Sequence, residues 1–159
     1  MTAFFLVADG ETSTVRANTI MENDTQGFSV VATELNIAMS DAQAGLRASV
    51  SDRETTNCLV NILTEASAVR VQASHSETLL FMSEVMRDHM DEALALHELR
   101  DEIKQLLKTL ADSREAVTIY MAMPTCSRTA SANVAGQQIL NALTHISAYS
   151  SQLLIRLPN

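Results

Sequence analysis

The chain has 159 residues, a formal net charge of −8 and only 11 lysine and arginine residues. Proteins that bind nucleic acid or anionic membranes through charge need a basic face, so this composition argues against both kinds of partner. Aromatic residues make up 4% of the chain, and four glycines and two prolines leave little material for tight turns. Because sheets need turn residues and favour aromatic and β-branched side chains, we expect an all-α fold.

The opening segment, residues 1–24, is expected to be an apolar strap or a flexible end ahead of the main helices. Residues 4–8 are the apolar run Phe-Phe-Leu-Val-Ala, which lacks the positive flank and the length of a signal peptide. Residues 14–22 favour a short helix, and residues 23–27 are expected to end it. No apolar stretch approaches the ~18 residues of a membrane span. We therefore expect a cytoplasmic chain without membrane insertion, although a chain without its targeting segment would look the same.

Two helical segments follow, at residues 28–49 and 52–73. Their apolar side chains recur in steps of three and four, which is the spacing of one helix face. Ser51 and Glu54 have the spacing of a capping box, which marks a helix start. No glycine or proline lies between the segments, so we favour one continuous or kinked helix. The predicted face carries Val31, Leu35, Ala38, Ala42, Leu46, Leu59, Leu63, Ala66, Val69 and Ala73.

The longest uninterrupted pattern covers residues 76–121, which contain no glycine or proline. Ser74 and Glu77 form a second capping-box pattern, so we expect a turn there and then one long helix. Residues 112–115 mark a second point at which a helix could restart. The predicted core face of this helix carries Leu79, Met82, Met86, Met90, Ala93, Leu96, Leu99, Ile103, Leu106, Leu110, Val117 and Tyr120.

A loop at residues 121–129 contains Pro124, and a last helix is expected over residues 130–157, before Pro158. Together these elements predict a single domain, residues 1–159. The expected fold is an antiparallel bundle of three or four long helices with coiled-coil-like packing. Long helices that extend beyond one core would expose an apolar stripe, so we also expect self-association into a homo-oligomer.

Cys58 and Cys126 are the only cysteines. Two thiols without close spacing form neither a disulfide framework nor a zinc site. Cys58 lies in a helical pattern and is expected in the core, whereas Cys126 follows Pro124 in the predicted loop and is expected to be exposed. These cysteines give no reason to expect an oxidising compartment.

The histidines give only a weak metal-binding pattern. A di-metal carboxylate bundle places a glutamate three residues before its histidine, but Met86 and Leu94 occupy those positions before His89 and His97. No phosphate-binding, dinucleotide-binding, nucleophile-elbow or zinc-protease motif occurs. We therefore predict no catalytic, metal or cofactor residues and a chain that is not an enzyme. A metal protein built in the bundle core remains an alternative.

Methionines recur every four residues at Met82, Met86 and Met90. Flexible thioether side chains suit a hydrophobic groove that accepts varied partners, and these three residues are our first candidates for partner binding. A methionine stripe at helical spacing is also typical of an ordinary core, so both interpretations stay open.

The sharpest local pattern is Gly-Phe-Ser-Val-Val-Ala-Thr-Glu-Leu at residues 27–35. It resembles the segment that follows the hairpin tip of bacterial chemoreceptor (methyl-accepting chemotaxis protein) signalling domains. The resemblance implies a long helical hairpin whose tip binds a signalling kinase and a coupling protein. It also implies that Phe28, Val30, Val31 and Glu34 lie in the partner-binding segment. The family's Arg-Ala-Gly-Glu before the Gly-Phe pair is absent here. The alternative is that this segment forms the first turns of a core helix.

A second resemblance covers residues 132–143 and 152–154. These segments are similar to the C-terminal helix of pilus-associated subunits of type IV secretion, which are three-helix, secreted and non-enzymatic. The leading prediction is a non-catalytic signalling or scaffold module that acts through protein–protein contacts. The second is a structural subunit of a secretion or virion-like assembly.

Overall fold

The computed structural model is all-α and describes residues 9–49 and 51–158, with side-chain surroundings from residue 25 onward. Within those residues the chain forms five helices and no strand. The helices are α1 (Asp9–Ala48), α2 (Arg53–Val85), α3 (Glu92–Ala122), the one-turn α4 (Pro124–Ser127) and α5 (Ala130–Arg156). The all-α prediction is therefore confirmed.

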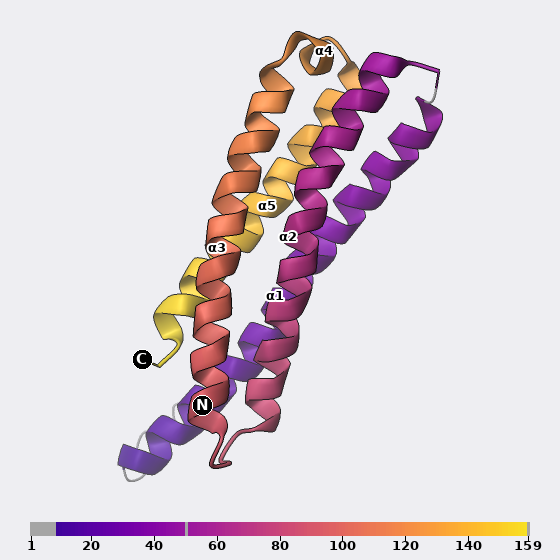
Figure 1. The fold of residues 1–159 in the computed structure, drawn as a ribbon. Coiled ribbons are helices and arrows are strands. Elements are labelled where there is room, and N and C mark those ends of the chain that lie inside the picture. Colours follow the sequence, from indigo (N-terminus) through magenta and orange to yellow (C-terminus); the bar gives the residue numbers. More distant parts are fainter. Residues whose placement is uncertain (1–8, 50, 159) are drawn as a thin grey trace.

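The four long helices lie alongside one another and give the molecule an elongated shape (Figure 1). Helix α1 packs against α2 and α5, α3 packs against the same two helices, and α2 also contacts α5. Each long helix packs against the next long helix along the chain. Among the described residues, no helix has the length and apolar character needed to cross a membrane.

One continuous apolar core runs between the long helices. The predicted faces point inward at most positions, because residues three and four apart lie on the same side of a helix. Val31 and Leu46 are only partly buried and lie at the margin of this core. The largest fully buried side chains are Phe28, Leu35, Met39, Leu59, Ile62, Leu80, Leu99, Ile103, Leu106, Leu110, Ile139 and Leu143.

The prediction of one long helix over residues 76–121 is wrong. Helix α2 runs through the expected turn at Ser74, and the reversal comes at residues 86–91. Ser74 and Glu77 both lie within α2, so the capping-box spacing there marks no helix start. Asp88 has φ 66°, the left-handed region that aspartate tolerates better than most residues. Its backbone N–H donates to the Glu92 carboxylate at 3.3 Å, which supports the turn without glycine.

The preference for a continuous helix through residues 49–52 is also wrong, because α1 ends at Ala48 and α2 begins at Arg53. Asp52, rather than Ser51, is the N-cap of α2. Its carboxylate accepts the Thr55 backbone N–H at 3.3 Å and the Thr55 hydroxyl at 2.6 Å. These hydrogen bonds lower the pKa of Asp52 below its ordinary value, because they favour the charged form.

Two other expected breaks are absent. Helix α1 continues through residues 23–27, and α3 continues through Asp112. The expected segment at residues 1–24 thus divides into helix from Asp9 onward and residues 1–8, which lie outside the described part. The last helix is confirmed as α5, and the predicted loop before it contains α4, which has Pro124 at its first position. Proline suits this position because the first N–H of a helix has no partner within it.

Candidate functional site

Large apolar side chains are exposed to solvent at the end of the molecule where α2 turns into α3. We name Phe81, Met82, Val85, Met90 and Leu94 the tip patch. Their exposed fractions range from 44% for Met82 to 99% for Met90. Phe81, Met82 and Val85 follow one another at helical spacing in the last turns of α2, on the side away from the buried Leu80 and Ser83. The exposure of so many large apolar side chains close together along the chain makes this turn a candidate interaction site.

The three predicted methionines do not form a stripe on one helix, which corrects that interpretation. Met82 lies in α2, Met86 is the residue after its end, and Met90 lies in the turn. The connection between α2 and α3 lies at one end of the molecule (Figure 1), and all three methionines lie in it or within one helical turn of it. Sequence reasoning missed Phe81, Val85 and Leu94, although their positions opposite the core stripe could have identified them.

Hydrogen bonds hold the end of α2 in place beneath the tip patch. The Thr25 hydroxyl of α1 donates to the Glu84 carboxylate, and the Ser29 hydroxyl donates to the Glu77 carboxylate. At the turn, Met86 N–H donates to the Met82 carbonyl at 2.9 Å, and His89 N–H donates to the Met86 carbonyl at 2.9 Å. Most backbone N–H groups at this turn therefore donate hydrogen bonds within the chain, and these bonds hold the tip patch in place.

The motif at residues 27–35 occupies part of α1, and its side chains point in different directions. Phe28 is fully buried and meets the Tyr149 ring edge to face, with ring centroids 6.3 Å apart. Val31 packs at the margin of the core, whereas Val30 is 69% exposed. The burial of Phe28 agrees with the core-facing part of the alternative interpretation. The segment does not form the first turns of its helix, however, because α1 begins at Asp9.

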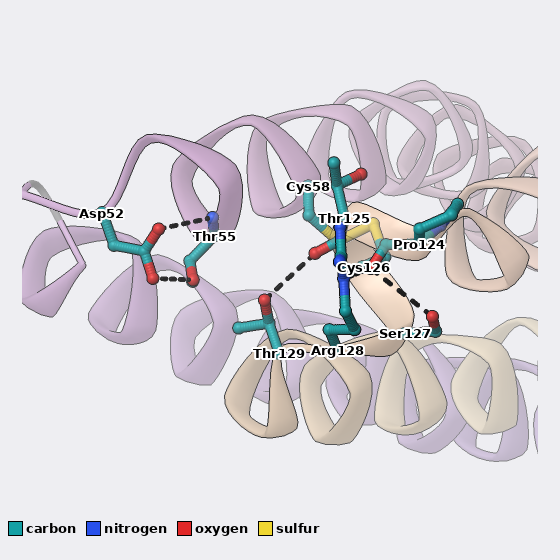
Figure 2. The surroundings of a disulfide bond; sticks show 9 residues. All are labelled: Asp52, Thr55, Cys58, Pro124, Thr125, Cys126, Ser127, Arg128 and Thr129. Atoms are coloured by element: carbon teal, nitrogen blue, oxygen red, sulfur yellow. Dashed lines mark hydrogen bonds between the residues drawn. A yellow bond between two sulfur atoms is a disulfide. The ribbon is translucent and has the colours of Figure 1, made fainter.

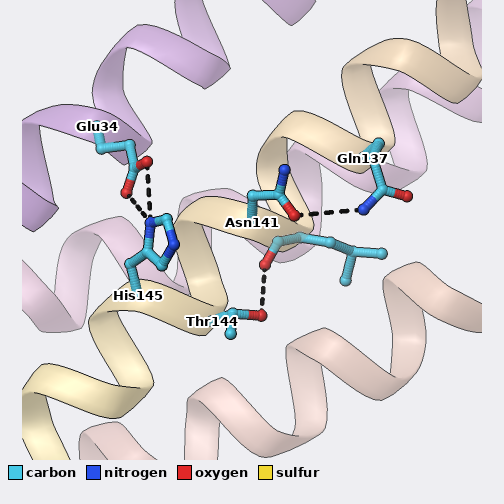
Figure 3. Close-up of polar contacts among 6 residues, drawn as sticks. Glu34, Gln137, Asn141, Thr144 and His145 are labelled. Carbon is cyan, nitrogen blue, oxygen red and sulfur yellow. Dashed lines mark hydrogen bonds and ion pairs between the residues drawn. The ribbon is translucent and has the colours of Figure 1, made fainter.

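Glu34, the fourth predicted contact residue of this motif, is joined to α5. His145 Nδ1 lies 2.7 Å from Glu34 Oε1 and 3.0 Å from Oε2 (Figure 3). Both side chains are about half exposed. Exposed pairs of this kind contribute about 0–1 kcal/mol, so the contact links α1 to α5 but is a minor source of stability.

Val30 and Glu34 border a shallow surface groove of about 440 Å³, which Ile37 also lines. A second groove of about 370 Å³ lies between α1 and α2 and includes Arg70 and Glu77. Both are open grooves along helix surfaces.

Cys58 and Cys126 form a disulfide, which corrects the prediction of two unlinked thiols and an exposed Cys126 (Figure 2). Their Cα atoms are 5.4 Å apart, and both residues are 2% exposed. The bond joins α2 to the short α4, which carries the connection between α3 and α5. Spacing could not reveal this pair, because 68 positions separate the two cysteines.

Within the part of the chain whose side chains are described, no three histidine, cysteine or acidic side chains form a group that could hold a metal ion. His97 lies 3.5 Å from Asp101 on the exposed side of α3, and His145 pairs with Glu34. The bundle-core metal alternative therefore gains no support from these residues. In comparisons with known proteins, the chain matches no family model, no curated protein and no solved structure.

Proposed function

We propose that the chain is a non-catalytic helical module, arranged as an antiparallel bundle, that acts through protein–protein contacts at the tip patch. The observation that carries this proposal is the exposure of five large apolar side chains within residues 81–94. Leaving apolar surface in water costs about 25 cal/mol per Å² relative to burying it. A partner that covers the patch would recover this free energy.

Site-specific photo-crosslinking in the cells that naturally produce the protein tests this proposal. A crosslinker at Met90 should give one defined protein adduct. A crosslinker at Val60, which is 44% exposed near the start of α2, is the matched control and should not give it. The same product at both positions, or none at Met90, would refute the proposal.

The chemoreceptor-like form of this function remains a narrower proposal. It requires a signalling kinase or coupling protein to recognise the segment at residues 27–35. Phe28 is enclosed by this chain's own core and Glu34 is paired with His145, so only Val30 of the four predicted contacts is freely exposed. We therefore favour the tip patch over this segment as the contact surface.

We propose as a second candidate a structural subunit of a secretion or virion-like assembly, because the buried Cys58–Cys126 disulfide favours it. Disulfides form and persist in oxidising compartments and are rare in the cytoplasm. On this proposal the chain works in an oxidising compartment rather than in the cytoplasm that the sequence suggested, and it associates with further copies of itself.

Thiol labelling with a mass-adding maleimide in cells lysed directly into denaturant, with and without prior reduction, separates the two locations, because unfolding exposes both buried cysteines to the reagent. A protein from an oxidising compartment should gain mass only after reduction, whereas a cytoplasmic protein should be labelled at both cysteines directly. Sedimentation of the purified protein over a range of concentrations tests self-association. A monomer at all concentrations would exclude a homo-oligomer.

A further inference from the structure

The turn between α2 and α3 combines exposed apolar side chains with an excess of acidic ones. Residues 84–92 contain Glu84, Asp88, Asp91 and Glu92 but only one arginine. Asp88 and Asp91 are exposed, and Glu92 is partly exposed. The Glu92 carboxylate is fixed beside the turn by the hydrogen bond from Asp88 N–H at 3.3 Å. Exposed acidic residues therefore flank Met90, the most exposed apolar side chain among the described residues.

Exposed apolar and acidic side chains together limit the kinds of partner that could cover the tip patch. A second copy would bring another acidic tip and a net charge of −8 toward the first, and like charges oppose such a contact. Anionic lipid surfaces and nucleic acids are disfavoured for the same reason. A partner that carries both apolar and basic side chains would satisfy the apolar and the acidic parts of the tip together.

We propose that the tip patch binds an amphipathic, basic helical segment of a partner protein. Methionine side chains adapt to differently shaped apolar faces, and an amphipathic helix offers such a face at residues i, i+3, i+4 and i+7. Asp88, Asp91 and Glu92 would meet lysine or arginine side chains at the edge of that face. This inference rests on the proposed function and adds the chemistry of the partner to it.

The test uses the full-length protein, with its disulfide intact, and a labelled peptide of about 18 residues, which is long enough to form a helix when bound. The peptide carries leucine at the helical spacing i, i+3, i+4 and i+7 and lysine at the other positions. A second peptide replaces each lysine with glutamate, and a third keeps the composition of the first in scrambled order. Fluorescence anisotropy should show binding of the first peptide only, and this binding should weaken as salt increases.

Variants of the chain separate specific docking from general attraction to an acidic protein. Phe81→Ser with Met90→Ser should weaken binding roughly ten-fold or more, as expected when central apolar contacts are lost. Asp88→Asn with Asp91→Asn should also weaken binding and reduce its salt dependence. Asp112→Asn with Glu115→Gln removes the same charge from exposed positions in the C-terminal third of α3 and should leave binding unchanged.

Equal weakening by the two charge variants would overturn the inference, as would binding of the scrambled peptide or no binding of the first peptide. Binding of the chain to anionic lipid vesicles that depends on Phe81 and Met90 would also overturn it, in favour of a membrane partner. If Met90 still crosslinks to one protein in cells while the basic peptide fails to bind, the proposed function stands and only the partner chemistry is wrong.

Discussion

Cys58 in the second turn of α2 and Cys126 in α4 are joined by a disulfide across 68 positions of sequence. The bond holds the connection between α3 and α5 against α2. Four residues of α4 alone could make few stabilising contacts, so this covalent link fixes the position of the chain between the two long helices.

Replacing both cysteines with serine should lower stability by about 4 kcal/mol, because a cross-link across this length of chain restricts the unfolded state strongly. Thermal unfolding with and without a reductant measures the effect. The reductant should lower the melting temperature of the wild-type protein and leave the double variant unchanged. Two reactive thiols in unfolded protein that was never reduced would show that the bond does not form.

Gly27→Ala should destabilise the protein, although alanine is ordinarily the better helix former. A Cβ atom at position 27 would overlap the Tyr149 hydroxyl oxygen and would lie 2.5 Å from the Tyr149 Cζ. Forcing this ring out of its site should cost about 1–3 kcal/mol. Urea unfolding of the variant measures the change in the free energy of unfolding.

Gly45→Ala is the matched control in the same helix. A Cβ atom there would meet only Leu59 Cδ1, at the ordinary contact distance of 3.7 Å. This variant should gain about 0.5–1 kcal/mol, because alanine lowers the entropy cost of forming the helix. If both variants shift stability in the same direction, the close approach of α1 to Tyr149 is wrong.

Phe28→Ala should cost about 3–5 kcal/mol, since it removes a fully buried aromatic side chain and its contact with Tyr149. Val30→Ala, two positions away and 69% exposed, should change stability by less than about 0.5 kcal/mol. Chemical denaturation of both variants provides the measurement. A stable Phe28→Ala protein that had lost a binding partner would instead favour the chemoreceptor-like interpretation.

Asp52→Ala should lower the melting temperature at neutral pH, because α2 loses its N-cap. The pKa of Asp52 is lowered in the folded protein, first by the Thr55 hydroxyl and then by the Thr55 N–H. A lowered folded pKa means that the carboxylate stabilises the fold above its ordinary pKa of 3.8. This contribution is lost as the pH falls through the folded value.

The difference in melting temperature between wild type and Asp52→Ala should therefore shrink in strongly acidic buffer. Asp52→Asn is the control, since asparagine also caps helices well but does not titrate. Its melting temperature at neutral pH should lie close to that of the wild type. A difference between wild type and Asp52→Ala that is independent of pH would show that the charged cap is not formed.

The sequence alone was sufficient to predict an all-α chain, most of the core face and the last helix. Apolar spacing carries this information because burial of one helix face is decided locally by residues three and four apart. Helix ends were predicted poorly. The chain breaks at Asp52 and Asp88 contain neither glycine nor proline. The Ser74 and Glu77 pattern, in contrast, lies inside a helix that packs against its neighbours on both sides of that point.

Only the tertiary structure decided the pairing of Cys58 with Cys126 and the burial of Phe28 against Tyr149, because both join residues far apart in sequence. The same is true of the tip patch. Met82 and Met90 were identified from their spacing as parts of one helix face, yet it is the chain reversal at Asp88 that brings them to one exposed end. Local patterns specify which side chains are apolar, whereas the positions of neighbouring helices determine which of them stay in contact with water.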